Sequence, residues 1–198
     1  MKRILVLLGI ALLLGACGNE ERDGAKSDTS LVIEPADLSE REQAIVNQMG
    51  VDYQTFYTLD GEINEGEVLE ASIDVYENGE GKRVISSVSN PDGNEFNQSL
   101  HSFQLLMEEK ESFFTLGEPS GYARGTEFLP DDLESYSFVS LEDNVTMKKG
   151  EPVYLAYLVG TSQSELSTEV NENKTALPKS VQEAEYAVVF KLEIKNEQ

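Results

Sequence analysis

The chain has 198 residues, of which 37 are acidic and 15 basic, and its formal net charge at pH 7 is −22. This charge excludes nucleic acid as a natural partner, because binding to a phosphate backbone requires a basic surface. One cysteine and one histidine exclude an internal disulfide and a zinc site built from these two residue types. We therefore expect no metal and no cofactor.

The first residues have the pattern of a signal peptide. Lys2 and Arg3 supply a short positive region, and residues 4–14 form an apolar run broken only by Gly9. At ~1.5 Å per residue this run spans ~17 Å as a helix, well short of a hydrocarbon core of roughly 30 Å. A permanent transmembrane helix is therefore the weaker interpretation.

The apolar run ends on Leu14, Gly15, Ala16 and Cys17, which resemble the lipobox of bacterial lipoproteins. The resemblance implies cleavage between Ala16 and Cys17 and attachment of lipid, with its palmitate-type acyl chains, to the Cys17 thiol. A free cysteine after an ordinary signal peptide is the alternative, but an unpaired thiol is a liability in an exported protein. We expect a lipoprotein on the extracytoplasmic face of the cell membrane.

Three regions follow from this interpretation: a signal peptide over residues 1–16, a lipidated flexible tether over residues 17–36, and a single β-rich domain over residues 37–198. Residues 1–16 hold two of the basic residues and none of the acidic ones, so the remainder carries 13 basic against 37 acidic residues, a charge of −24. Anionic headgroups and anionic wall polymers would repel such a surface, except through bridging divalent cations.

A helix is expected directly after the tether. Asp37 or Ser39 can cap it, Glu40 or Glu42 can complete a capping box, and Gly50 stands where a C-terminal glycine belongs. Its apolar residues share one face, which we expect to dock on the core: Leu38, Ile45, Val46 and Met49.

From Tyr53 onward the apolar residues alternate with polar ones. In residues 68–76 the alternation predicts Leu69, Ala71, Ile73 and Val75 inside and Glu70, Ser72, Asp74 and Tyr76 in water. Asn78-Gly79 predicts a hairpin across residues 77–82, with a second strand over residues 83–89. Further strands are expected over residues 53–59, 102–107, 113–116, 136–141, 152–160 and 186–194.

These elements predict a mainly β protein, an antiparallel β-sandwich with one N-terminal amphipathic helix. No helical segment of crossover length separates the strands, as a parallel sheet would require. Two connections are long, residues 117–134 and 161–185. We favour solvated, mobile chain over a binding loop for both, with a short helix possible over residues 181–185.

The search for catalytic chemistry is mostly negative. A Ser-His-Asp mechanism would have to use His101, which begins an apolar strand, and no Gly-x-Ser-x-Gly accompanies it. A histidine on the surface or on an edge strand is the favoured interpretation. The sequence also lacks a phosphate-binding Gly-x-x-x-x-Gly-Lys and a dinucleotide fingerprint. We therefore predict no catalytic residue.

Calcium is the one metal that the composition permits. Oxygen-bearing residues gather in one glycine-containing stretch: Asp60, Glu62, Asn64, Glu65 and Glu67. The stretch is not an EF-hand, since glycine is absent from the sixth position, and a solvated acidic hairpin loop is the favoured interpretation. A second acidic group, Asp131, Asp132 and Glu134, is a weaker candidate.

Three stretches resemble lipoproteins of Gram-positive bacilli: residues 38–45, residues 75–79 and residues 149–156. The resemblance implies a membrane location and a β-rich fold, and no site residue beyond Cys17. A non-catalytic module that binds an envelope protein or wall ligand is the leading function. A small hydrolase or wall-modifying enzyme is the alternative, which a deep pocket around His101 or several carboxylates would favour. A transporter's solute receptor is third.

Overall fold

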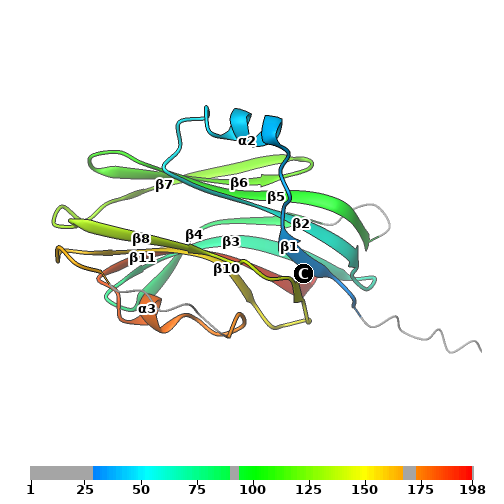
Figure 1. Cartoon of the computed structure of the whole chain (residues 1–198). Coiled ribbons are helices and arrows are strands. Elements are labelled where there is room, and N and C mark those ends of the chain that lie inside the picture. Colours follow the sequence, from blue (N-terminus) through cyan, green and yellow to red (C-terminus); the bar gives the residue numbers. More distant parts are fainter. Residues whose placement is uncertain (1–28, 90–93, 167–172, 198) are drawn as a thin grey trace, which may run out of the picture.

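The computed structural model describes residues 29–89, 94–166 and 173–197. Two antiparallel sheets lie face to face (Figure 1), so the predicted antiparallel sandwich is confirmed. The six-stranded sheet has the order β7 (Gly121–Phe128), β6 (Glu111–Glu118), β5 (Glu95–Met107), β2 (Tyr53–Glu62), β1 (Val32–Pro35) and β9 (Val145–Thr146). The five-stranded sheet has the order β4 (Glu80–Ser89), β3 (Glu67–Glu77), β11 (Tyr186–Asn196), β10 (Val153–Thr161) and β8 (Ser135–Ser140).

The core lies between the two sheets. The four apolar side chains of β3 that were predicted to face inward are all buried there: Leu69, Ala71, Ile73 and Val75. Phe103 of β5 stacks on Phe190 of β11, with ring centroids 5.4 Å apart and planes 16° apart. Contact between aromatic rings from opposite sheets fixes how the two layers face one another.

The predicted hairpin joins β3 to β4. Its turn is the dipeptide Asn78-Gly79, with φ of 50° and 82°. Positive φ at both central residues is the requirement of a type I′ turn, which Asn-Gly meets at little steric cost. The hairpin is therefore confirmed, with strands that reach closer to the turn than predicted.

Residues 32–35 correct the predicted extent of the tether. They form β1, which pairs with β2 and β9, and Leu31 and Ile33 are fully buried. The short apolar cluster in a polar stretch is therefore part of the core, and the folded domain begins before residue 37. The rest of the predicted tether before residue 29, with Ala16 and Cys17, lies outside the described residues.

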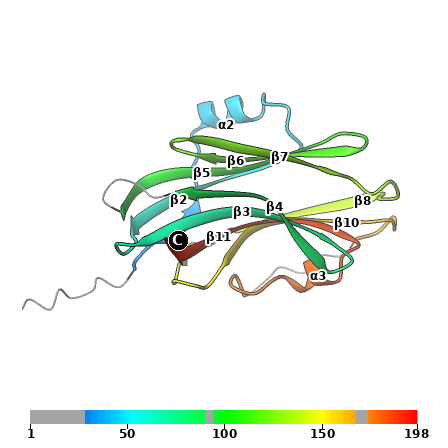
Figure 2. The same cartoon turned by 180° about the vertical axis from the view of Figure 1, so that it is seen from behind.

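Residues 121–128 correct the prediction of a mobile connection over residues 117–134. They form β7, a regular partner of β6 that also lies against β4 at the corner where the two sheets meet (Figure 2). A Cβ at Gly125 would lie 2.6 Å from Ile85, so glycine permits this close approach. Lys82 and Glu127 close the same corner with an ion pair of 2.5 Å.

The connection between β10 and β11 covers the outer face of the five-stranded sheet. It carries the short helix α3 (Lys179–Gln182), which overlaps the predicted helix at residues 181 and 182. Val181 packs with Tyr157, Val189 and their neighbours in a second apolar cluster. The part of this connection around α3 is therefore packed on the sheet, which corrects the prediction there, whereas residues 162–165 are exposed. Residues 167–172 lie outside the described residues.

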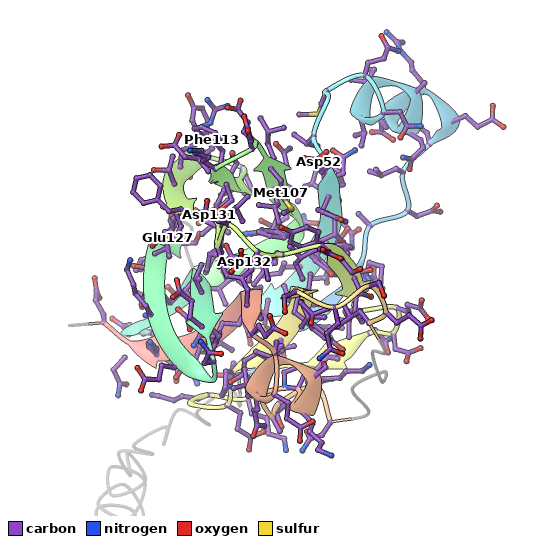
Figure 3. The ribbon with its side chains drawn as sticks, turned by 90° about the vertical axis from the view of Figure 1, so that its left-hand side faces the viewer. Asp52, Met107, Phe113, Glu127, Asp131 and Asp132 are labelled. Carbon is purple, nitrogen blue, oxygen red and sulfur yellow. The ribbon has the colours of Figure 1, made fainter. Side chains whose placement is uncertain are left out.

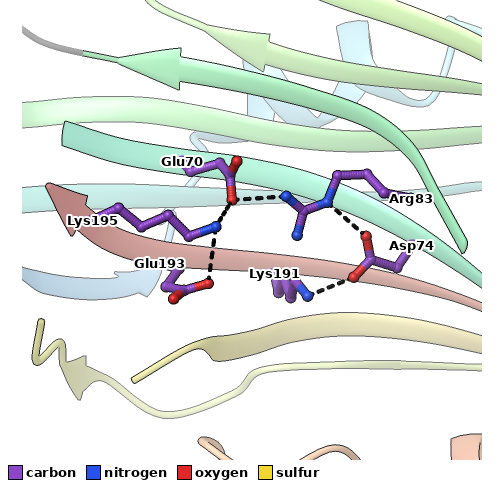
Figure 4. Close-up of polar contacts among 6 residues, drawn as sticks. All are labelled: Glu70, Asp74, Arg83, Lys191, Glu193 and Lys195. Carbon is purple, nitrogen blue, oxygen red and sulfur yellow. Dashed lines mark hydrogen bonds and ion pairs between the residues drawn. The ribbon is translucent and has the colours of Figure 1, made fainter. Parts of the chain in front are cut away.

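The same outer face carries an ion-pair network (Figure 4). Arg83 contacts Asp74 at 3.1 Å and Glu70 at 3.0 Å, and Lys191 contacts Asp74 at 2.5 Å. Asp74 is 6% exposed and Ser72 only 1%. The expectation that the polar set of β3 lies in water is therefore wrong for these two residues, because neighbouring strands and their long basic side chains cover them.

The predicted N-terminal helix is α2 (Glu40–Val46), on the outer side of the six-stranded sheet. Ser39 caps it and forms the capping box with Glu42: the backbone N–H of Ser39 donates to the Glu42 carboxylate at 2.8 Å. Of its predicted apolar stripe only Val46 is buried, while Ile45 is 55% and Met49 49% exposed. Docking of the whole stripe on the core is therefore wrong. No helix in the described part of the chain is long and apolar enough to cross a membrane.

Candidate functional site

A groove lies between the chain that follows α2 and the outer face of the six-stranded sheet. Its volume is about 580 Å³, one side is open to solvent, and we call it the outer groove. Four separate parts of the chain line it: Met49, Gly50, Val51; Gln104, Leu106; Phe113, Phe114, Thr115; and Arg124, Gly125, Thr126. Strand alternation determines which side chains form the floor of the groove. Phe103, Leu105 and Phe114 point into the core, so their neighbours along the strands point outward.

Among the described residues, none that lines the outer groove is acidic, although the chain has 37 acidic residues. Its one formally charged residue is Arg124, whose guanidinium carbon lies 4.9 Å from the centre of the Tyr122 ring. Such a cation–π contact keeps the guanidinium against the edge strand and contributes ~0.5–1 kcal/mol at an exposed site. The groove is therefore an apolar surface with a positive border.

Large apolar side chains are exposed on the elements around the outer groove. These residues lie in or next to α2 and on β5 and β7: Ile45, Met49, Leu100, Tyr122 and Phe128. Tyr122 is 68% and Phe128 70% exposed. Exposed apolar surface that gathers on one layer, beside a groove, is typical of an interaction site rather than of scattered surface residues.

In the view of Figure 3, Asp52 and Met107 lie between α2 and the groove residue Phe113. The Asp52 carboxylate accepts a hydrogen bond of 2.7 Å from the Met107 backbone N–H, which joins the start of β2 to the end of β5. Asp131 and Asp132 lie in the exposed connection that follows β7. The carboxylate of Asp52, which directly follows the lining residue Val51, therefore has a structural partner.

The chain's match to a known family spans most of this architecture. Residues 32–194 match the YgaN domain, from the first residue of β1 into β11. The chain belongs to the YgaN domain family. No curated protein and no solved structure matches it. In this YgaN domain the matched range includes every residue of the outer groove.

His101 does not lie on the surface or on an edge strand of the YgaN domain, and that expectation is wrong. It is 2% exposed, on β5 near the middle of the six-stranded sheet, because its alternation matches that of Phe103 and Leu105. Its Nε2 lies 3.2 Å from the Ser99 hydroxyl. Burial lowers the pKa of His101, and the charge of Glu118 opposes this effect. His101 is not among the residues that line the outer groove.

The acidic stretch from Asp60 to Glu67 is not a hairpin loop. It connects β2 to β3, which lie in different sheets, so the chain crosses the sandwich here. Glu67 is buried, receives hydrogen bonds from Thr29 and Asn64, and pairs with Lys149 at 2.9 Å. Burial alone would raise the pKa of Glu67, but these contacts outweigh it and lower the pKa to about 2.

Asp60 accepts a hydrogen bond of 2.9 Å from the Gln98 side chain and does not share the partners of Glu67. Within residues 29–89, 94–166 and 173–197, no group of three or more His, Cys, Asp or Glu side chains is placed to hold a metal ion. Of the candidate calcium ligands, the structure brings Asn64 and Glu67 together through hydrogen bonds and gives Asp60 a separate partner. Cys17 and Ala16, the predicted lipid-attachment and cleavage residues, lie outside the described residues.

Proposed function

We propose that the protein is a lipid-anchored envelope lipoprotein and that its YgaN domain is a non-catalytic binding module. The main support for a binding function is the outer groove. It combines an apolar floor, an open side and exposed aromatic residues, which suit a segment of a partner protein. A small molecule is a poorer fit, because ligand pockets typically bury ~70–90% of the ligand surface.

The charge of the domain indicates which class of partner it can bind. At −24 for the part after residue 16, the surface favours a basic protein and repels anionic lipid and anionic wall polymers. The groove itself accepts apolar side chains, because Leu106 and Phe113 form its floor. We therefore propose an amphipathic partner segment that inserts its apolar face and directs basic residues away from Arg124, toward the acidic surface of the rest of the domain.

The anchor rests on the sequence of the first seventeen residues. Lys2 and Arg3, the apolar run and the Leu14–Cys17 pattern together resemble a lipoprotein signal, and Cys17 is the proposed site of lipid attachment. We expect labelled palmitate to be incorporated into the wild-type chain. Cys17→Ser should abolish the label and leave uncut precursor or protein shed into the medium. Unchanged labelling of this variant would refute the anchor.

Site-specific photo-crosslinking tests the groove in the anchored protein. A benzophenone amino acid at Thr126 should capture a partner, and the groove-filling change Thr115→Trp should prevent that capture. The matched control places the same group at Glu183, an exposed position on the opposite side of the molecule. The same adduct from Glu183, or no effect of Thr115→Trp, would contradict binding in the groove.

Two peptides test the proposed partner chemistry. They share the same apolar positions on one helical face and carry either lysine or glutamate on the other. The lysine peptide should bind the purified domain more tightly, lose affinity as salt is raised, and be excluded by Thr115→Trp. Equal binding of the two peptides would show that the acidic surface does not select the partner.

A further inference from the structure

Two ionisable side chains, His101 and Glu118, lie inside the sandwich and do not line the outer groove. The register that pairs Ser102 of β5 with Gly117 of β6 places His101 directly opposite Glu118 on the adjoining strand. Residues opposite one another in an antiparallel pair point to the same side of the sheet, with Cβ atoms ~4.5–5.5 Å apart. His101 and Glu118 are therefore neighbours on the inner face of the six-stranded sheet.

Each of these two side chains has one buried atom without a hydrogen-bond partner in the described ranges. The atoms are Nδ1 of His101 and Oε1 of Glu118. Their other polar atoms are engaged. His101 Nε2 lies 3.2 Å from the Ser99 hydroxyl, and Glu118 Oε2 accepts a hydrogen bond of 2.7 Å from the Ser89 hydroxyl. Because Ser89 belongs to β4, Glu118 joins the two sheets.

The other groups that face His101 do not titrate in the same range. Tyr57 of β2 is its neighbour on the opposite side, and the Tyr57 hydroxyl donates to the Leu155 carbonyl at 2.6 Å. Burial raises the pKa of Tyr57 to about 12, so this residue stays neutral. Glu118 of β6 is the charged group that acts on the imidazole.

A proton would connect the two buried atoms. Neutral histidine has one N–H, whereas protonated histidine donates from both ring nitrogens, and a carboxylate accepts at both oxygens. When the neutral ring carries its hydrogen on Nε2 and donates it to the Ser99 hydroxyl, Nδ1 has no hydrogen to donate. Protonation adds Nδ1–H as a second donor, and Glu118 Oε1 on the adjoining strand is an acceptor without a partner among the described residues. A charge-assisted hydrogen bond between them would satisfy both atoms, and such bonds are about twice as strong as neutral ones.

We propose that His101 and Glu118 form a proton-binding site that completes a chain of hydrogen bonds from Ser99 through His101 and Glu118 to Ser89. The chain runs from β5 through β6 to β4 and therefore makes the contact between the two sheets pH-dependent at this end of the sandwich. Burial lowers the pKa of His101 below its ordinary value of 6.5, and the charge of Glu118 opposes this shift.

NMR of the imidazole tests the site directly, because His101 is the sole histidine of the chain and its ring signals need no further assignment. In the wild-type protein the ring should titrate below pH 6.5, and a low-field signal from a hydrogen-bonded Nδ1 proton should appear in acid. Failure of the ring to titrate before acid unfolding, or absence of that signal, would overturn the proposal.

Variants separate the proton site from a merely structural role. Glu118→Gln should reduce the proton affinity of His101 by roughly tenfold or more and abolish the low-field signal. The matched control is Glu111→Gln, which removes the same charge from the other end of β6. Ser89→Ala should move the midpoint less than Glu118→Gln does. Equal midpoints for Glu118→Gln and Glu111→Gln would refute the pairing.

Discussion

The two outer faces of the sandwich differ in what covers them. On the five-stranded sheet, the chain between β10 and β11 lies over Tyr157 and Val189, which are at most 3% exposed. On the six-stranded sheet, the seven-residue helix α2 covers only part of the face and leaves Tyr122 and Phe128 about 70% exposed. Both faces carry apolar residues, so strand pattern alone does not decide which face is buried.

The chain that lies over a face decides whether that face joins the core or stays open to solvent. The covered face belongs to the stable core of the domain, as its apolar cluster and its ion-pair network show. The open face retains the outer groove, which a longer connection would have filled. Substitutions on the covered face should therefore reduce stability, whereas substitutions on the open face should reduce binding and change stability little.

The largest expected effect is on the covered face, at Val189. Val189→Asp places an unpaired carboxylate under α3, where the wild-type side chain is fully buried. We expect the free energy of unfolding to fall by about 4 kcal/mol, because a buried charge without a partner is strongly destabilising. Urea melts measure the change. A loss below 1 kcal/mol would show that this face is less tightly covered than described.

Asp74→Ala probes the polar half of the covered face. It leaves Lys191, whose side chain is 13% exposed, and Arg83 without their shared carboxylate. Breaking a buried ion pair from one side costs ~3–5 kcal/mol, and the exposure of Arg83 brings our expectation to the lower limit, about 3 kcal/mol. Adding Lys191→Met should restore part of the loss in a double-mutant cycle. Additive losses would argue against direct pairing.

Glu67 probes the crossover that joins the two sheets. Its pKa of about 2, against an ordinary 4.5, corresponds to about 3 kcal/mol of stability that the ionised carboxylate supplies. Because the folded pKa is the lower one, this stability is present above pH 4.5 and is lost as the pH falls toward 2. Glu67→Gln should therefore be destabilised at pH 7 and should flatten the decline between pH 4.5 and 2. A parallel decline in both proteins would refute this origin.

The smallest expected effect on stability is on the open face. Tyr122→Ser removes an exposed ring and its contact with Arg124, and should change the free energy of unfolding by less than ~0.5 kcal/mol. The same variant should weaken binding of the lysine peptide if the exposed aromatic residues belong to the interface. A large loss of stability would instead assign Tyr122 to the core.

Much of the fold could be predicted from local sequence. The alternation in β3 and the Asn78-Gly79 turn depend on near neighbours in the chain, and both were confirmed. β7 was missed because Gly121 and Gly125 look like loop residues, and the need for glycine at Gly125 arises from Ile85, forty residues earlier. β1 was missed because four residues in a polar stretch carry little periodicity.

The candidate site could not be predicted, because its residues have no common motif. Met49, Leu106, Phe113 and Arg124 come from four parts of the chain and meet only through the strand order of the folded sheet. The burial of His101 was within reach of the sequence, since the alternation of Phe103 and Leu105 extends to it. Its pairing with Glu118 needed the register of β5 and β6.

The attachment of β1 has a mechanical consequence for an anchored domain. A pull on the chain before residue 29 would act along β1, which is bonded on both sides to β2 and β9, so its hydrogen bonds would be loaded together in shear. Thr29 adds a bond to Glu67, and Ser30 a backbone bond to Glu62. With the proposed lipid anchor, force from the membrane would thus reach the six-stranded sheet first, and rupture would be governed by how fast β1 slides out rather than by the stability of the whole fold.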